Sequence, residues 1–392
     1  MNLLCVILFF IVWRVTLFGV GSFADSILKY KPSFPYYYDL STYHLPRWVY
    51  SWAGFDGVHY LTIAKHGYIG TGLVQAFFPL YPLVLLHTVY FLFNTHINLI
   101  FLGLLFSNIF ALTLSIVWFL FVRDMSDTKT AWVALLLLFF FPTSFFLGAF
   151  YTESLFLLLV VLTFFSARKK FWFLSSLFAG LAIVTRVVGI FLIPALLIEM
   201  WMQEYSVFSL DQIAKKSRFF LQRYWPQISW LVISCIGLVI YMTFLNHEFH
   251  DPFYFLHIQS SFGGGRQSSF VLYPQVVWRS VKILHDIRPF DLKYLTYAQE
   301  FLFGTLGLVC VLASFKFVRL SYAVFSLCAF LVPPLTGSFS SMPRYTLVSF
   351  SIFIMLATLL QKRRFLQYLY FLSFAVYLVL NTVLFIQGYW IA

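Results

Sequence analysis

Long apolar stretches separated by short polar junctions dominate this chain. A helix of about 20 mostly apolar residues is long enough to cross the hydrocarbon core of a bilayer. The pattern therefore predicts an all-α polytopic membrane protein with about 10–12 transmembrane helices in a single domain, residues 1–392. The clearest predicted spans are 2–23, 97–122, 131–147, 149–167, 227–246, 299–316, 320–337, 346–361 and 365–388.

Two long polar segments, 24–76 and 247–297, interrupt the apolar pattern and are predicted to be loops. Residues 77–94 are apolar but contain Pro79 and Pro82, because of which we expect a re-entrant or interfacial helix. A full span over these residues is the alternative. A further segment, 203–226, is basic and amphipathic, which is typical of a helix that lies at a membrane surface.

Residues 172–201 are predicted to form a broken hairpin, because neither half is long enough to span and the break falls near Arg186. Irregular backbone at membrane depth must be buried or line a cavity. The basic junctions around 123–129, 168–170, 215–223, 316–319 and 362–364 set the orientation. If these junctions lie inside and 77–94 does not span, both polar loops, the hairpin tip and the 333–344 junction share the outer face.

Composition supports a membrane protein, since 61% of the residues are hydrophobic and only 10% are charged. A soluble domain is about half apolar and a quarter charged. The net charge of +12 raises the question of nucleic-acid binding, but the basic residues lie at helix ends, where they suit anionic lipid surfaces. We therefore expect membrane lipids and no nucleic acid as partners.

The N-terminal apolar run and the cysteines add little to this picture. Ser22 and Ala24 offer small side chains for signal cleavage, but the run lacks a basic start and is long, which favours an uncleaved first helix. The four cysteines lie in apolar runs and form no CxxC pair, so neither a disulfide framework nor a zinc site is indicated. They are Cys5, Cys235, Cys310 and Cys328.

Arg14 lies near the middle of the first predicted span. A charge at that depth costs about 3 kcal/mol on insertion scales. We expect Arg14 to point into a polar cavity or to pair with a carboxylate, with snorkelling to the headgroups as the alternative.

The segment 47–82 is polar and aromatic and lies between apolar runs. In a short helix, the spacing of Asp56, His59 and Tyr60 places these three residues on one face. A carboxylate such as Asp56 suits a general base that takes a proton from a hydroxyl. The alternative is that Asp56 caps a short helix beginning near Val58.

The sequence 55–68, Phe-Asp-Gly-Val-His-Tyr-Leu-Thr-Ile-Ala-Lys-His-Gly-Tyr, and then 76–82, Ala-Phe-Phe-Pro-Leu-Tyr-Pro, resemble the PIG-V-like mannosyltransferases. This family includes the second mannosyltransferase of glycosylphosphatidylinositol-anchor (GPI-anchor) synthesis and prokaryotic relatives. Segments 142–156, 185–189 and 342–345 resemble family motifs as well. The resemblance implies a membrane glycosyltransferase of the GT-C type.

By this resemblance, the enzyme moves a hexose, mannose in most of the family, from a polyprenyl- or dolichyl-phosphate donor to a lipid or glycan acceptor. It implies that Asp56 is the catalytic base, and a single base with direct displacement inverts the anomeric centre. No cofactor is expected. The reaction would take place on the exoplasmic face, in the plasma membrane of a prokaryote or the endoplasmic reticulum of a eukaryote.

Three arginines are candidates for binding the donor phosphate, because guanidinium matches phosphate geometry. They are Arg186, Arg344 and Arg266, the last following a run of three glycines that suits an anion site or a mobile lid. The alternative for Arg186 and Arg344 is a place at the headgroup level. Candidate substrate-binding residues are His59, Tyr60, His66, Tyr68, Glu153 and Gln259.

Glu153 begins an apolar span, so a helix N-terminus explains its carboxylate, but it also fits an acceptor-side residue or a partner of Arg14 or Arg186. The histidines are scattered without paired ligand spacing, so no metal site is expected. Two departures, Phe55 and Gln75, stand where the family usually has Trp and acidic or His residues. They put the acceptor specificity in doubt.

A transporter or lipid flippase is the alternative function, with Arg14 and Arg186 in the pathway. Transporters commonly show repeated halves and binding residues at the midplane. No repeat is visible in this sequence, and its unusual polar residues are predicted to share one outer face. That asymmetry favours an enzyme.

Overall fold

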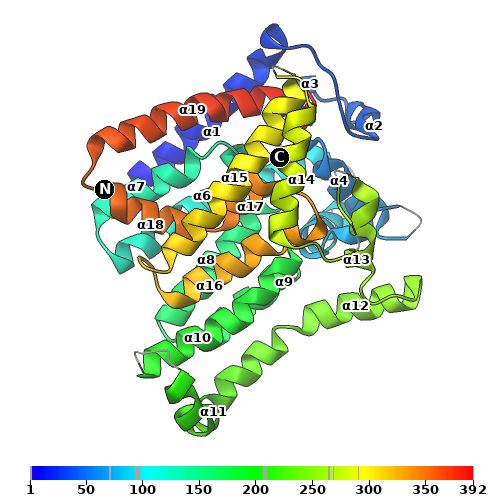
Figure 1. Cartoon of the computed structure of the whole chain (residues 1–392). Helices are drawn as coiled ribbons and strands as arrows, with labels where there is room; N and C mark the ends of the chain where they lie inside the picture. Colours follow the sequence, from blue (N-terminus) through cyan, green and yellow to red (C-terminus); the bar gives the residue numbers. More distant parts are fainter. Residues whose placement is uncertain are drawn as a thin grey trace.

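The computed structural model describes residues 2–69, 72–92, 98–205, 210–263, 265–267, 269–289 and 291–391, and Gly264 of the glycine run lies outside these ranges. Within them, every regular element is helical (Figure 1). The longer helices are α1 (Asn2–Ile27), α4 (Asp56–His66), α6 (Leu99–Met125), α7 (Thr128–Phe139), α8 (Glu153–Arg168), α9 (Trp172–Ile183), α10 (Leu192–Tyr205), α11 (Leu210–Ile233), α12 (Ile236–Phe249), α14 (Tyr273–Asp286), α15 (Leu292–Ser314), α16 (Leu320–Leu331), α18 (Ser351–Leu360) and α19 (Arg364–Ile386).

Short helices fill the junctions between them. They are α2 (Tyr37–Ser41), α3 (Arg47–Tyr50), α5 (Thr88–Leu92), α13 (Tyr254–His257) and α17 (Met342–Val348), the π-helix η3 (Leu80–His87), and the 3-10 turns η1 (Ser51–Ala53), η2 (Val74–Ala76), η4 (Ser144–Leu147), η5 (Val187–Phe191), η6 (Ile258–Phe262) and η7 (Pro333–Thr336).

The chain is a polytopic all-α membrane protein, as predicted. Among the described residues, six helical stretches are long and apolar enough to cross a membrane: Asn2–Ile27, Leu99–Met125, Val187–Tyr205, Ala214–Phe249, Leu292–Ser314 and Arg364–Ile386. The pair α17 and α18, bent by 71°, would make a seventh. The other predicted spans are shorter helices because they break, for example where α7 ends at Phe139 shortly before Pro142.

Helix α8 lies at the centre of the bundle (Figure 1) and packs against α6 and α9. From Glu153 to Val161 every side chain of α8 is buried. A helix that is apolar all round belongs in an interior, and aromatic residues such as Phe164, Phe121 and Phe350 fill the space around it. This central position carries Glu153, at the first turn of α8, into the middle of the protein.

Within the described residues, which stop at Leu92 and resume at Asn98, the apolar stretch Leu80–Leu92 is shorter than a span, and it begins directly after Pro79 as a π-helix. The Leu80 backbone N–H donates to the Val184 carbonyl at 3.0 Å. This bond joins the stretch to the break between α9 and α10, where the hairpin was predicted. The arrangement agrees with a re-entrant or interfacial helix and brings the two irregular segments together.

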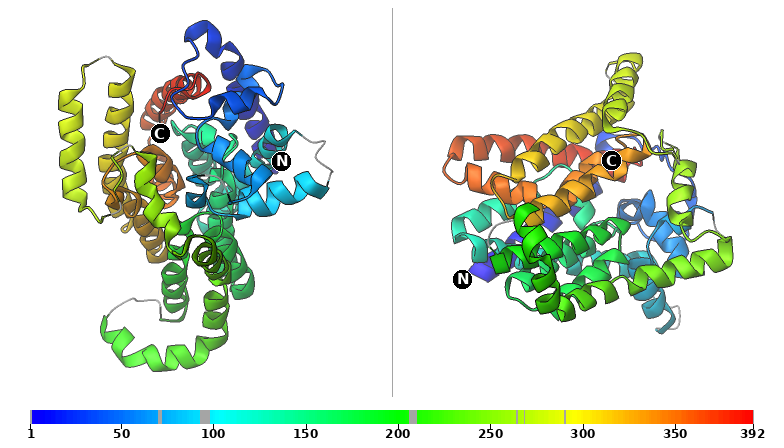
Figure 2. Two further views of the ribbon diagram at one scale, coloured as in Figure 1. Left: turned by 90° about the vertical axis from the view of Figure 1, so that its right-hand side faces the viewer. Right: turned by 60° about the horizontal axis from the view of Figure 1, so that its bottom comes forward.

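Helices α11 and α12 form an arm that curves away from the bundle (Figure 2). The amphipathic helix predicted at 203–226 appears as α11, which runs past Pro226 and carries exposed Phe219 and Trp225 among basic residues. Helix α14, in the second polar segment, is also amphipathic, with Trp278 69% exposed. Such faces suit a membrane surface.

Helices α1 and α19 lie side by side (Figure 1). After α19 the chain turns back, and the backbone N–H groups of Lys31 and Ser33 donate to the carbonyls of Gln387 and Gly388 at 2.9 and 2.8 Å. The first polar segment and the segment 387–391 are thereby held together at the same end of the bundle as α4.

Candidate active site

A cavity of about 830 Å³ lies where α4, the break before α10, the second polar segment, α15, α17 and the segment after α19 meet. Seven of the residues singled out from the sequence line it: Asp56, His59, Tyr60, Arg186, Gln259, Arg266 and Arg344. The predicted convergence of these segments is therefore found in the structure. Which side of the membrane the cavity faces stays a prediction.

Asp56 is the first residue of α4, and its side chain is 22% exposed. Its carboxylate makes no capping bond to the helix N-terminus; Oδ2 instead accepts a hydrogen bond from Nη1 of Arg344 at 2.7 Å. Asp56 therefore does not act as the cap that was the alternative in the sequence. Its backbone N–H is held by the hydroxyl of Tyr151 at 3.2 Å, and that hydroxyl donates to the Gly54 carbonyl at 2.8 Å.

The residue before Asp56 has an unusual backbone conformation. Phe55 has φ 55° and ψ −116°, a region that costs a non-glycine residue about 1–3 kcal/mol and that clusters at functional sites. Its ring is fixed by the rings of Phe34, Phe385 and Trp390, with centroids 4.5, 5.6 and 5.2 Å away. These contacts maintain the turn that directs the Asp56 carboxylate into the cavity.

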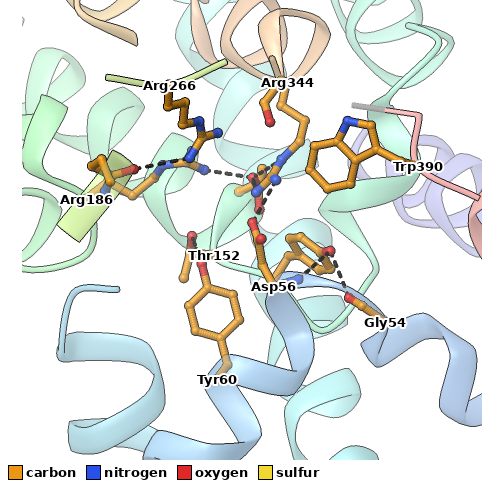
Figure 3. A network of polar contacts seen from close by, with 12 residues as sticks. Gly54, Asp56, Tyr60, Thr152, Arg186, Arg266, Arg344 and Trp390 are labelled. Atoms are coloured by element: carbon orange, nitrogen blue, oxygen red, sulfur yellow. Dashed lines mark hydrogen bonds and ion pairs between the residues drawn. The ribbon is translucent and has the colours of Figure 1, made fainter. Parts of the chain in front are cut away.

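Arg344 and Arg186 meet on one buried carboxylate (Figure 3). Glu153 is completely buried, and its Oε1 accepts from Nε and Nη2 of Arg344 at 3.0 and 2.7 Å and from Nη1 of Arg186 at 2.7 Å. Arg344 therefore joins Glu153 to Asp56. Two carboxylates and two guanidiniums balance in charge, which allows such a cluster to be buried.

Arg344 also lies over the rings of Phe146 and Tyr151, at 4.7 and 4.9 Å from their centroids. Cation–π contacts of this kind add to the hydrogen bonds in holding the guanidinium in place. The side chain is only 5% exposed. The pairing of Asp56 with Arg344 is therefore a fixed feature of the cavity wall.

Electrostatics keep Asp56 charged and His59 uncharged near neutral pH. Burial by itself would raise the pKa of the Asp56 carboxyl, but the Arg344 guanidinium outweighs it, with smaller help from His59 and Arg266, and the pKa lies below its ordinary value. Burial lowers the pKa of the His59 imidazole against the opposing pull of Asp56. The His59 ring stacks on Phe77 at 5.0 Å, which fixes it at the wall.

Three cations of the cavity wall are not used in ion pairs. Within the ranges that the structure describes, Lys31, Arg266 and Lys293 contact no carboxylate closely enough for a salt bridge. Arg266 donates from Nη1 to Oε1 of Gln259 at 3.1 Å, which positions the guanidinium. These groups are available to an anionic ligand, whereas Arg186 and Arg344 already bind carboxylates.

Three predicted substrate-binding residues lie elsewhere. Glu153 is behind the wall, beneath Arg186 and Arg344. Tyr68 is buried against Tyr241, and its hydroxyl donates to the Phe77 carbonyl at 2.7 Å. His66 lines a second, smaller cavity on the other side of α4, and His59 lies at the wall that both cavities share.

The prediction that Arg14 points into a polar cavity or pairs with a carboxylate is wrong. Its side chain is buried, so it does not snorkel either, and it lies over the rings of Phe18 and Trp52 at 3.9 and 4.3 Å. Nη2 donates to the Gly148 carbonyl at 2.6 Å. The aromatic faces and the carbonyl replace the expected carboxylate.

Glu300 and Trp390 line the cavity but were not singled out in the sequence. Glu300 could have been identified from the sequence, since a carboxylate inside an apolar span marks a functional site. Trp390 could not, because it follows the last span without any motif. In the part of the chain that the structure covers, no group of three or more His, Cys, Asp or Glu side chains is arranged to hold a metal ion.

No family model and no curated protein matches the sequence, so the resemblance to PIG-V-like mannosyltransferases stays a prediction from its motifs. The crystal structure of the Archaeoglobus fulgidus oligosaccharyltransferase in complex with Zn and sulfate is similar, with a TM-score of 0.44 and 14% identity over 96% of this chain and 53% of that one. A second crystal structure of that enzyme, tethered with an acceptor peptide containing the NVT sequon, gives a TM-score of 0.43 and 12% identity, covering 97% of this chain and 55% of that one. The chain thus spans about half the length of the protein that it resembles.

Proposed function

We propose that this protein is a membrane glycosyltransferase that moves a hexosyl group, mannosyl by its motifs, from a polyprenyl- or dolichyl-phosphate donor to a hydroxyl of a lipid or glycan. The observation that carries the proposal is the ionised Asp56 carboxylate, 22% exposed at the wall of a cavity that also holds unpaired cations. A base beside an anion site is what transfer from a phosphate leaving group requires.

In this mechanism Asp56 takes the proton of the acceptor hydroxyl as its oxygen bonds to the anomeric carbon. The bond from that carbon to the phosphate oxygen breaks on the opposite face, and its electron pair leaves with the phosphate, so the configuration inverts. A carboxylate held below its ordinary pKa is a weak base. It therefore accepts the proton late in the transition state, when the attacking oxygen has become acidic.

The departing phosphate is stabilised by Arg266, with Lys31 and Lys293 as further cations. Arg186 keeps one of its two terminal nitrogens free of the bond to Glu153 and can reach the same phosphate. Arg344 instead orients Asp56 and lowers its pKa. Arg344 is assigned the orienting role because it is the guanidinium that binds Asp56 itself, whereas Arg186 binds only Glu153.

His59 and Tyr60 project from the same face of α4 as Asp56 and are proposed to contact the sugar or the acceptor. Gln259 holds Arg266. We infer from the basic junctions that this wall faces the exoplasmic side. We place the protein in the plasma membrane of a prokaryote or the endoplasmic reticulum of a eukaryote.

The alternative transporter or flippase needs Arg14 and Arg186 in one pathway, but Arg14 lies outside the cavity.

The test is a membrane assay with radiolabelled polyprenyl-phosphate mannose, followed by identification of the labelled product. Asp56→Asn keeps the size of the side chain and should abolish transfer with the protein still folded. Asp251→Asn is the matched control, because Asp251 lies in the second polar segment with its side chain against His257, outside the cavity. Full activity in Asp56→Asn would remove Asp56 from the mechanism.

A further inference from the structure

The segment 387–391 after α19 forms one wall of the cavity. On one side its carbonyls at Gln387 and Gly388 accept from the backbone of residues 31–33. On the other side, α15 holds it: the Thr296 hydroxyl donates to the Trp390 carbonyl at 2.7 Å, and the Gln299 amide donates to the Ile391 carbonyl at 3.3 Å. A segment fixed from both sides presents its side chains to the cavity in a defined orientation.

The Trp390 ring is held at two places. Its indole N–H donates to Oε1 of Glu300 at 3.3 Å, and Phe55 packs against it at 66° with ring centroids 5.2 Å apart. Trp390 lines the same cavity as Asp56 and Arg344, and all three are labelled in Figure 3. With its rotation fixed, the indole offers a rigid apolar surface within the cavity.

Glu300 has an unused carboxylate oxygen. The side chain is 4% exposed, and Oε1 accepts from the Ser341 backbone N–H at 3.1 Å as well as from Trp390. Within the described ranges Oε2 makes no hydrogen bond and Glu300 makes no ion pair. Because Glu300 lines the cavity, this oxygen is free to accept from a donor that a ligand supplies.

We propose that Glu300 and Trp390 form the subsite for the sugar ring that the donor phosphate carries. One face of a pyranose is apolar C–H and packs on an indole, while its hydroxyls donate to a carboxylate oxygen. The unused Oε2 of Glu300 has two lone pairs and can accept from two neighbouring hydroxyls. This inference rests on the proposed function. It assigns the transferred group to the class of hexopyranoses with adjacent free hydroxyls.

The position of Lys293 agrees with this assignment. Lys293 and Glu300 both line the cavity from α15, seven residues apart, so they lie on one face about 10 Å apart along the axis. A hexosyl phosphate can bridge that separation with its phosphate at Lys293 and its hydroxyls at Glu300. Asp56 and Arg266 line the same cavity.

The test compares two ligands on the purified protein: polyprenyl-phosphate mannose and polyprenyl phosphate without a sugar. The wild type is expected to prefer the sugar-bearing lipid. Glu300→Gln should reduce that preference about tenfold, since one hydrogen bond contributes about 1–1.5 kcal/mol. Trp390→Leu should reduce it as well, because the leucine offers no flat surface to the sugar ring. The affinity for the sugar-free lipid should not change.

The matched control is Trp278→Leu, because Trp278 lies exposed on α14, outside the cavity. Thermal melting identifies any variant that fails to fold, and Trp390→Phe, which keeps an aromatic ring but no N–H, then replaces Trp390→Leu and should lose part of the preference. An unchanged preference in folded Glu300→Gln overturns the subsite, and so does an equal loss for both lipids. If the wild type binds neither lipid, the proposed function itself fails, which this design separates from failure of the subsite.

Discussion

Arg344 donates from Nη1 to Oδ2 of Asp56 at 2.7 Å, although the two residues lie 288 positions apart in the chain. Because the same guanidinium also donates to Glu153, the bond joins α4, α8 and α17 around the candidate site. Arg344 holds the Asp56 carboxylate in its orientation and is the main cause of its lowered pKa. The contact therefore connects the stability of the protein to its proposed chemistry.

Arg344→Ala should destabilise the protein by about 3–5 kcal/mol, because it leaves buried Glu153 with fewer partners and Asp56 with none. Arg344→Lys keeps the charge but cannot bridge both carboxylates, so a smaller loss is expected. Thermal melting in detergent measures both. Arg364→Ala, at an exposed helix start, is the control. Equal melting temperatures for Arg344→Ala and the wild type would show that the ion pairs contribute nothing to stability.

The acid side of the pH profile should report the state of Asp56. Its pKa lies below the ordinary 3.8, so transfer should hold down to that region and fall only as Asp56 is protonated. Since Arg344 lowers this pKa more than Arg266 does, the acid limb should move to higher pH in Arg266→Gln and further in Arg344→Gln. The measurement is kcat/KM against pH. An acid limb at the same pH in all three proteins would show that another group controls it.

The lowered pKa of Asp56 also makes the stability of the folded protein depend on pH. A depressed pKa in the folded state means that ionised Asp56 contributes stability above the ordinary pKa of 3.8, and that this contribution is lost as pH falls through the folded value. Melting temperature measured between pH 7 and the acid range should therefore decline less in Asp56→Asn than in the wild type. An identical decline would mean that Asp56 is not the titrating group.

The amino-acid sequence predicts where the site's residues lie along the membrane normal, but not which side chains touch. Asp56 is recognisable from the motif of its polar segment, and Arg186 and Arg344 because charges at breaks between apolar helices are costly without a role. Glu153 was considered as a partner of Arg186, which is found. Its bond to Arg344, 191 positions away, depends on how helices pack laterally, and periodicity does not encode that.

Arg14 and Trp390 show two further limits of the sequence. The guanidinium of Arg14 is accommodated by aromatic faces and one carbonyl, a solution that leaves no charge pattern in the chain. Trp390 lines the cavity because the chain turns back toward α15 after α19. There its carbonyl accepts from Thr296 and its indole N–H donates to Glu300. In both cases contacts between distant parts of the chain determine what surrounds the side chain, and the local spacing of residues does not predict these contacts.

Arg266→Ala should raise the KM for a polyprenyl-phosphate sugar about tenfold or more, because a charge-assisted hydrogen bond to phosphate contributes about 1.5–3 kcal/mol. The KM for the acceptor should stay the same. Arg288→Ala is the control, since Arg288 is an exposed cation of the same polar segment outside the cavity. Equal rises in both KM values would count against a role for Arg266 at the phosphate.

The side of the membrane on which the cavity opens can be tested with single cysteines. Arg266→Cys, in a background without the four native cysteines, should react with a membrane-impermeant maleimide added outside intact cells. Arg363→Cys, in a basic junction, should react only after the membrane is opened. Reaction at both positions from outside would show a leaky preparation. Reaction at position 363 but not 266 from outside would invert the topology and place the proposed transfer on the cytoplasmic face.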